Sequence, residues 1–280
     1  MKFIYSSDIH GDINKYENLI SLCEQNKISY IVLGGDLFSK NHDKRIPIQI
    51  DFINGYFRDF LNKIKKKNIE LICITGNDDL VIPTNEYYRL IEKYENVHDV
   101  NQTKYDELEI SFIGLKYVLD APFKRKDNIA LEKGLEMPEQ WSNEIYVDNC
   151  QKIISKEEWK EYRKKCPMME QLLKELPQPT KNNKTIYLFH EPPYGLGLDL
   201  CKDGTIAGSK AILKFIENSK AYMSLHGHIH ESYLLSKIWN TKIGETISIQ
   251  LGQSELGEKE LHYAIIDTDK NEYKMFIKHL

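Results

Sequence analysis

Three short apolar runs, each followed at once by a polar loop that contains glycine, constrain the fold of this chain more than any other feature. The runs span residues 3–5, 28–33 and 69–74, and their loops read SDIHGD, GGD and GNDD, ending at Asp12, Asp36 and Asp79. Short apolar runs bounded by glycine predict buried strands.

The segments between these runs predict helices. From Ile13 to Cys23, apolar residues recur at helical spacing, and Asp12 can cap this helix over residues 12–26. A longer helix is predicted over 47–67. Alternating strands and helices make a βαβαβ pattern, which is typical of an α/β fold with a mostly parallel sheet.

The carboxyl ends of parallel strands meet at one edge of a sheet, where ligand sites of α/β proteins lie. We therefore expect Asp8, His10, Asp36 and Asn77 to converge there. If the first strand continues through residues 8 and 10, their side chains point the same way and form half of a metal site. The alternative is a plain strand–turn–helix with a surface Asp and His.

Beyond the third loop, residues 84–98 predict a helix and residues 108–115 predict a strand. Residues 116–182 then interrupt the alternation and predict a helical insertion or lid. One of its helices begins with a capping box, in which Ser155 is the N-cap and Glu158 follows three residues later. A solvated decoration without a role is the alternative.

The alternation resumes with a strand at 185–189, which ends at His190. A later strand leads into His226, His228 and His230, and three imidazoles at alternate positions of an extended segment face one side and can bind metal. Residues 232–280 alternate apolar and polar side chains and predict antiparallel strands that close a second sheet or edge.

Composition narrows the class of protein. The net charge of −4 argues against a nucleic-acid partner, because domains that bind nucleic acids are usually strongly basic. Five scattered cysteines predict free or buried thiols in a reducing compartment. We expect no secretory signal and no membrane partner, because no apolar run approaches the ~20 residues that span a bilayer. A cytoplasmic location is predicted, and the oligomeric state is left open.

Taken in order, five blocks resemble the calcineurin-like metallophosphoesterases: Asp8-X-His10, Gly34-Gly35-Asp36, the loop from Gly76 to Asp79, His190, and Gly227-His228-X-His230. The resemblance implies one domain over 1–280, a two-sheet β-sandwich flanked by helices, with 116–182 inserted in it. The stretch from His190 to Gly195 and the end at Glu231 are similar to a small-phosphodiesterase branch.

The resemblance also implies two metal ions at one edge of the sandwich. One would be held by Asp8, His10 and His230, the other by Asn77, His190 and His228, and Asp36 would bridge them. Mixed nitrogen and oxygen ligands suit divalent or trivalent ions, with Mn first and Fe, Zn or Ni as alternatives.

The implied function is dinuclear hydrolysis of phosphodiesters by attack of a metal-bound hydroxide. Cyclic nucleotides and other small phosphorylated compounds are the candidate substrates. The alternative is a catalytically weak or inactive scaffold on the same fold.

One residue departs from the family pattern. The residue after the liganding Asn is commonly a His, and here it is Asp78, the candidate catalytic acid. Nearby metals disfavour the protonated form of a carboxyl group. Asp79 is expected to orient other groups. Tyr194, Trp141 and Trp159 could line a base-binding pocket or pack beneath the insertion.

Overall fold

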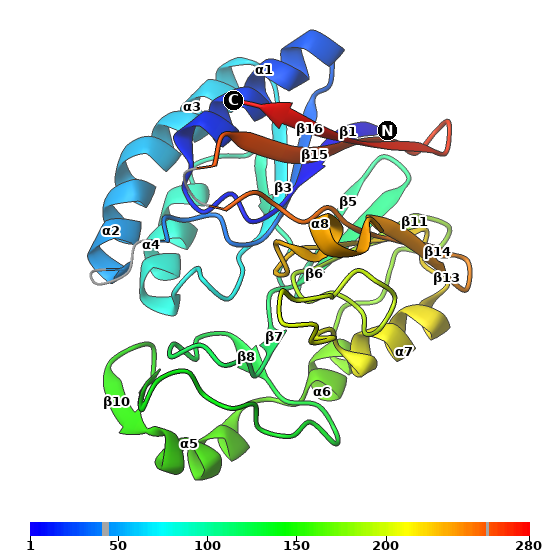
Figure 1. Ribbon diagram of the computed structural model, residues 1–280. Coiled ribbons are helices and arrows are strands. Elements are labelled where there is room, and N and C mark those ends of the chain that lie inside the picture. The colour runs from blue at the N-terminus through cyan, green and yellow to red at the C-terminus, as the bar shows by residue number, and fades with distance from the viewer. Residues whose placement is uncertain (41–44, 256–257) are drawn as a thin grey trace.

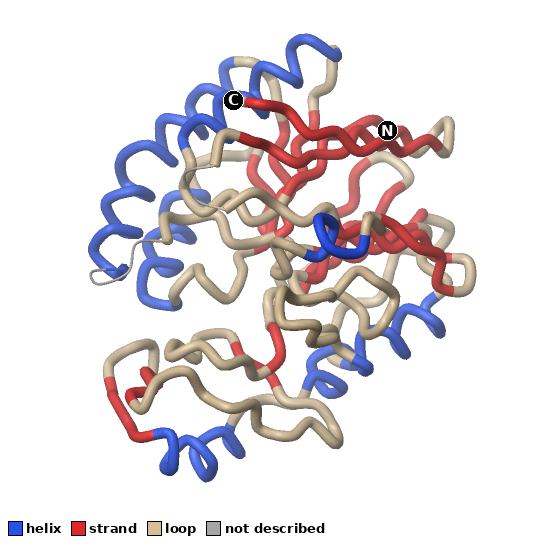
Figure 2. Tube along the Cα trace, in the orientation of Figure 1, coloured by secondary structure: helices blue, strands red, loops and turns tan. Residues whose placement is uncertain are grey.

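Two six-stranded sheets stack face to face, with helices on both outer faces (Figures 1 and 2). This arrangement is seen in a computed structural model that describes residues 1–40, 45–255 and 258–280. The first sheet has the order β16 (Glu272–His279), β15 (Glu260–Asp267), β1 (Lys2–Ser6), β2 (Tyr30–Gly34), β3 (Glu70–Ile74) and β4 (Val97–Asp99). The second has the order β13 (Asn240–Ile243), β14 (Thr246–Gln250), β12 (Met223–His226), β11 (Lys184–Phe189), β6 (Ile110–Leu115) and β5 (Lys104–Glu107).

Alternating side chains of the first sheet fill two different cores. Phe3 and Val32 pack between the sheets, against residues such as Leu188 of β11. Ile4 and Leu33 point the other way and pack beneath the helices. Because successive strand residues face opposite sides, strands that are buried on both sides have the continuous apolar sequences seen here. The predicted two-sheet sandwich flanked by helices is confirmed.

The helices over the first sheet follow the predicted order. Helix α1 (Ile13–Asn26) begins after Asp12, whose carboxylate accepts hydrogen bonds from the Asn14 and Lys15 amides. The long second helix consists of α2 (Arg45–Phe52), a π turn (η1, Ile53–Phe57) and α3 (Arg58–Lys66).

The prediction for residues 84–98 was partly wrong. Helix α4 spans Val81–Ile91, and Val97–Asp99 forms edge strand β4, which pairs in parallel with β3. The shortness of β4 explains the error, because a three-residue strand cannot show the period of two.

The chain after residue 232 adds strands to both sheets. The sequence predicted instead that antiparallel strands here would close a second sheet or edge. After helices α7 (Lys210–Ser219) and α8 (Ser232–Ser236), β14 pairs in parallel with β12 and antiparallel with β13. Strand β15 then crosses to the first sheet and pairs antiparallel with β1. The alternation in sequence identified the strands but not their neighbours.

Residues 116–182 form the lobe at the bottom of Figure 1 and are less helical than expected. They contain β7 (Val118–Leu119), β8 (Ile129–Ala130), β9 (Glu144–Val147), β10 (Lys152–Ser155), α5 (Lys156–Tyr162), a 3-10 turn (η2, Arg163–Lys165) and α6 (Met169–Lys174). The unexpected hairpin β9–β10 turns at 148–150, where three successive residues have positive φ.

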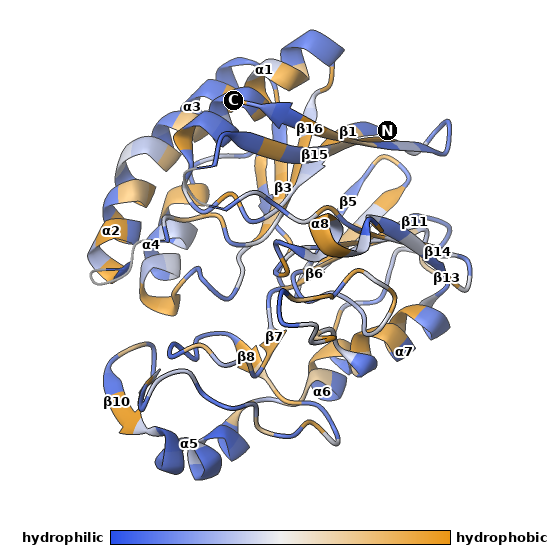
Figure 3. Ribbon diagram, viewed as in Figure 1, coloured by the Kyte–Doolittle hydropathy of each residue, from blue (hydrophilic) through white to orange (hydrophobic). Residues whose placement is uncertain are grey.

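A small core holds this lobe together. Trp159 of α5 is fully buried and clusters with Ile145, Val147 and Ile154 of the hairpin. The predicted capping box is present, because the Ser155 hydroxyl accepts from the Glu158 amide and the Glu158 carboxylate accepts from the Ser155 amide. Figure 3 shows the contrast between the polar α5 and the apolar β10.

All five cysteines are free thiols, as expected. Among the helices in the described part of the chain, none combines the length and hydrophobicity that crossing a bilayer requires.

Candidate metal centre

The loops after β1 and β2 run side by side beyond the ends of their strands. The amides of Asp8, His10 and Gly11 donate to the carbonyls of Gly35, Asp36 and Leu37 at 3.0, 2.8 and 2.9 Å. These bonds continue the parallel pairing of the two strands into the polar segment. They bring Asp8, His10 and Asp36 to one place, as the βαβ pattern predicts.

The predicted reason for this convergence was wrong for the first loop. Strand β1 ends at Ser6, and Asp8 and His10 both have positive φ, 55° and 49°. Asp36 (51°) and His228 (72°) share this left-handed backbone. Non-glycine residues rarely adopt it, and such conformations concentrate at functional sites. The ligand side chains are therefore placed by tightly turned loops rather than by an extended strand.

A first group of donor atoms consists of Asp8, His10, Asp36 and His230, all buried, with one ligand atom of each within 4.8 Å of the others. The two Nε2 atoms of His10 and His230 lie 3.0 Å apart. His230 Nε2 is 3.6 Å from Asp8 Oδ1, and His10 Nε2 is 3.7 Å from Asp36 Oδ2.

A second group surrounds His190, whose side chain is fully buried. Its Nε2 lies 3.1 Å from Asn77 Oδ1, 3.4 Å from Asp36 Oδ2 and 3.9 Å from Asp8 Oδ1. The His228 ring lies beside it, with ring centroids 5.4 Å apart. Asp36 thus stands between the two groups, and the seven predicted ligand side chains lie together.

The chemistry of these donors fits bound cations. His190 Nδ1 lies 2.7 Å from the Gly34 carbonyl oxygen and donates to it, so Nε2 points toward the centre. Nε2 there faces two acceptor oxygens, on Asn77 and Asp36. Acceptors crowded in this way need a positive charge among them. The buried His10 Nδ1 lacks a hydrogen-bond partner among the described residues.

The pKa shifts show the same need for positive charge. Burial opposes the charged form of His190, but Asp36 and Asp8 raise its pKa to about 10. Burial likewise opposes charging of His230, and its contacts with Asp8 and Glu255 raise its pKa to about 9. In the protein alone, protons on these two histidines balance the charge of the carboxylates, and metal ions at these positions would displace those protons.

Asp79 holds together two of the loops that form the centre. Its buried carboxylate accepts hydrogen bonds from the amides of Leu37, Phe38 and Gly76, at 2.8 to 2.9 Å. It therefore ties the loop after β2 to the loop after β3, as an orienting residue would. Burial and the charge of Asp36 raise the pKa of Asp79 to about 8.

His226 and Glu191 make supporting contacts beside the centre that the sequence did not predict. His226 does not share the orientation of His228 and His230: its Nδ1 contacts the carbonyls of Phe189 and Glu191, at 3.2 and 2.9 Å. Glu191 accepts from the Leu119 amide and lies 3.9 Å from His228 Nε2. The position of Glu191 directly after His190 was the one signal in the sequence.

Comparison with known proteins settles the family. A sequence model of the calcineurin-like phosphoesterases matches residues 1–232. The chain belongs to this family. It is a metallophosphoesterase with a buried Asp/His cluster suited to divalent metals.

Individual relatives are more distant. The DNA double-strand break repair protein Mre11 of Nanoarchaeum equitans (strain Kin4-M) is 35% identical over 88 residues. This match covers 27% of the present chain and 23% of that protein, less than a quarter of its length.

Solved structures share the fold over nearly the whole chain. The protein TT1561 of Thermus thermophilus has a TM-score of 0.59 and 17% identity, over 98% of this chain and 97% of that one. A dimetal phosphatase from Danio rerio, LOC 393393, has a TM-score of 0.54 and 10% identity, over 100% of this chain and 95% of that one.

In this phosphoesterase, Asp78 is engaged by two cations. Its carboxylate lies 2.5 Å from an Arg45 guanidinium nitrogen and 3.1 Å from Lys40 Nζ, and its amide donates to Asp36. Burial favours the neutral acid, but Lys40 and Arg45 hold the pKa of Asp78 well below its usual range. An ionised carboxylate has no proton to donate to a leaving group.

The three aromatic residues considered for a base pocket lie in different surroundings. Trp159 is buried in the 116–182 lobe. Lys210 Nζ lies over the Tyr194 ring, 4.9 Å from the ring centroid. Trp141 is 73% exposed and packs on Phe123.

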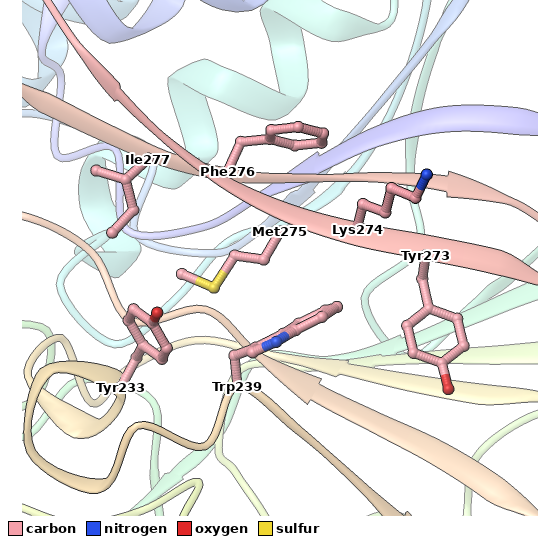
Figure 4. A pocket seen from close by; sticks show the side chains of 7 residues that line it. All are labelled: Tyr233, Trp239, Tyr273, Lys274, Met275, Phe276 and Ile277. Carbon is pink, nitrogen blue, oxygen red and sulfur yellow. The ribbon is translucent and has the colours of Figure 1, made fainter.

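A hollow of about 410 Å³ lies elsewhere, between β16 and the α8–β13 segment, and is lined by Tyr233, Trp239 and Tyr273 among others (Figure 4). It contains none of the predicted ligands, so we assign it no part in the metal centre.

Gly76→Ala should weaken metal binding at the centre. A Cβ there would lie 2.2 Å from Asp36 Oδ1, 2.5 Å from the Asp36 amide nitrogen and 2.7 Å from His190 Nε2, so Asp36 must move. We expect bound metal, measured by inductively coupled plasma mass spectrometry, to fall below half of the wild-type value. Overpacking should also lower the free energy of unfolding by about 1–3 kcal/mol.

Gly55→Ala is the matched control, because no atom lies within 4 Å of a Cβ at that helical position. It should keep its metal and lose no stability. Full metal occupancy in Gly76→Ala would contradict the assigned role of Asp36.

Proposed function

We propose that this phosphoesterase binds two metal ions and hydrolyses small phosphodiesters. The observation that carries the proposal is the position of Asp36, with one carboxylate oxygen 3.7 Å from His10 Nε2 and 3.4 Å from His190 Nε2. A pair of close cations requires a shared anion between them, and the Asp36 carboxylate lies between the two groups of donors. One ion would be held by Asp8, His10 and His230, and the other by Asn77, His190 and His228.

The charge of the ligand set favours an anionic substrate. Asp8 and Asp36 supply two negative charges, so two divalent ions would leave a net charge of about +2. Burial favours neutral Asp8, but its contacts with His230, and then the charges of His190 and His10, keep its pKa well below the usual range. Burial lowers the pKa of His228 to about 3, so its imidazole is neutral and ready to bind metal.

When bound, the pair of ions would polarise phosphoryl oxygens and activate a water molecule. The protein's own groups would orient this chemistry. The Gly34 carbonyl fixes the His190 tautomer, and the amide of His228 donates to both oxygens of Asp8, at 3.0 and 3.2 Å. Mn is the first metal to test, before Fe, Zn and Ni.

We also propose that residues 116–182 act as a lid within a single domain of residues 1–280. Several contacts join this segment to the centre, including hydrogen bonds from the Asn128 side-chain amide group to the Gly76 and Asp79 carbonyls. The Leu119 amide donates to Glu191, and the Phe123 ring lies 6.4 Å from the His228 ring, measured between centroids. Although one relative is named as a DNA repair protein, the net charge of −4 favours a small substrate over nucleic acid.

Metal-dependent hydrolysis tests the function directly. With Mn added, we expect about two ions per chain and hydrolysis of bis(p-nitrophenyl) phosphate that a chelator abolishes and fresh Mn restores. In His190→Ala, kcat/KM should fall by more than the roughly 10- to 100-fold that loss of an outer-shell partner costs.

The control is His279→Ala, at a position 84% exposed on β16, which should match wild type. A metal-loaded wild type that hydrolyses no member of a panel of mono- and diesters would favour the scaffold alternative. An unaffected His190→Ala would exclude the proposed ligand set.

Asp78→Asn separates an acid role from a positioning role. Because Asp78 pairs with Arg45 and Lys40, we expect kcat to change by the same factor for p-nitrophenyl and alkyl phosphodiesters. A general acid would instead show a selective loss on the alkyl ester, whose leaving group needs a proton, of about 10²-fold or more.

The exposed Asp51→Asn on α2 serves as the charge-matched control. An unchanged rate on both esters would remove Asp78 from the mechanism altogether.

A further inference from the structure

Two aromatic side chains of the 116–182 lobe stand in solvent beside the metal centre. Trp141 is 73% exposed and Phe123 is 41% exposed, and their rings meet edge to face with centroids 5.2 Å apart. Large apolar side chains exposed together near a catalytic centre mark a surface for a ligand. The other tryptophan of the lobe, Trp159, is fully buried.

The pair is held in place by backbone hydrogen bonds on both sides of Phe123. The Trp141 amide donates to the Pro122 carbonyl at 3.1 Å, and the Tyr146 amide donates to the Lys124 carbonyl at 2.7 Å. The first bond joins the two aromatic segments directly. A fixed aromatic surface loses little conformational entropy when it binds a planar ring.

A buried ionic cluster anchors the same segment. The Asp120 carboxylate accepts from Lys126 Nζ and Arg163 Nε, both at 2.9 Å, and from the Trp159 indole at 3.2 Å. Lys126 Nζ also donates to the Ala121 carbonyl at 2.5 Å. Residues 120–126 are thus fixed to the core of the lobe, and Phe123 projects from them.

The aromatic pair adjoins the metal centre through His228. Its ring packs edge to face against Phe123, with centroids 6.4 Å apart, and its backbone amide binds Asp8. A phosphate at the centre and a planar group on Phe123 and Trp141 could therefore belong to one small molecule.

We propose that Phe123 and Trp141 bind the base of a nucleotide whose phosphate lies at the metal centre. This assignment rests on the proposed function and names nucleotide phosphodiesters as its substrate class. The two rings are nearly perpendicular, at 81°, so the face of a nucleobase can stack on one ring while the other ring meets it edge to face, whereas an alkyl ester would leave the indole exposed. Stacking of this kind tolerates any base, so the pair would select nucleotides without selecting a sequence.

Binding of adenosine 5′-monophosphate and ribose 5-phosphate tests the proposal without relying on turnover. The two compounds share the sugar phosphate and differ in the base. We would titrate each into the Mn-loaded full-length protein by calorimetry and follow phosphate release in the same samples. The nucleotide should bind roughly 5- to 150-fold more tightly, which is the factor that one stacked base contributes.

Trp141→Ala and Phe123→Ala should each reduce this affinity ratio toward 1. Phe276→Ala is the matched control, because Phe276 is also an exposed aromatic residue (39%) but lies on β16, stacked on Tyr263. It should keep the wild-type ratio. Thermal melts would confirm that the variants fold, and exposed Trp141 should be replaceable at little cost in stability.

Equal wild-type affinities, or a preference that survives both substitutions, would overturn the assignment. The two proposals fail separately. A nucleotide preference without hydrolysis of any ester would reject the proposed activity and keep the base site. Hydrolysis without the preference would reject the base site alone.

Discussion

The candidate centre depends on the pairing of two loops beyond the ends of their strands. Three backbone hydrogen bonds join residues 8–11 to residues 35–37, and they hold the turned backbone from which Asp8, His10 and Asp36 project. The buried Asp79 carboxylate extends this pairing to the next loop, through three amide donors. The sandwich supplies parallel strands that end at one edge, and the loops convert that edge into a set of convergent ligands.

Glycine makes this close approach possible at two positions. A Cβ on Gly35, whose φ is 106°, would lie 2.4 Å from His190 Nδ1, and one on Gly76 would lie 2.2 Å from Asp36 Oδ1. These contacts explain why the loops after β2 and β3 carry glycine just where His190 enters from the second sheet. The two sheets thus meet at the centre through a histidine of one and the glycine loops of the other.

The sequence predicted the central strands of both sheets, most helices and the convergence of the ligands, because these follow from local periodicity and from the geometry of parallel sheets. It could not predict how the loops turn, since positive φ at Asp8 and His10 is imposed by tertiary hydrogen bonds rather than by residue type. The alternate spacing of His226, His228 and His230 suggested one shared face, yet His226 points toward the carbonyls of Phe189 and Glu191. The partners of Asp78 were equally hidden, because Arg45 and Lys40 lie more than thirty residues away in the sequence.

We propose that Asp36 bridges two metal ions, and anomalous diffraction from crystals of the Mn-loaded protein would locate those ions. We expect two anomalous peaks about 3.5–4 Å apart, one among Asp8, His10 and His230 and one among Asn77, His190 and His228, with Asp36 in contact with both. A single peak, or two peaks without Asp36 between them, would contradict it.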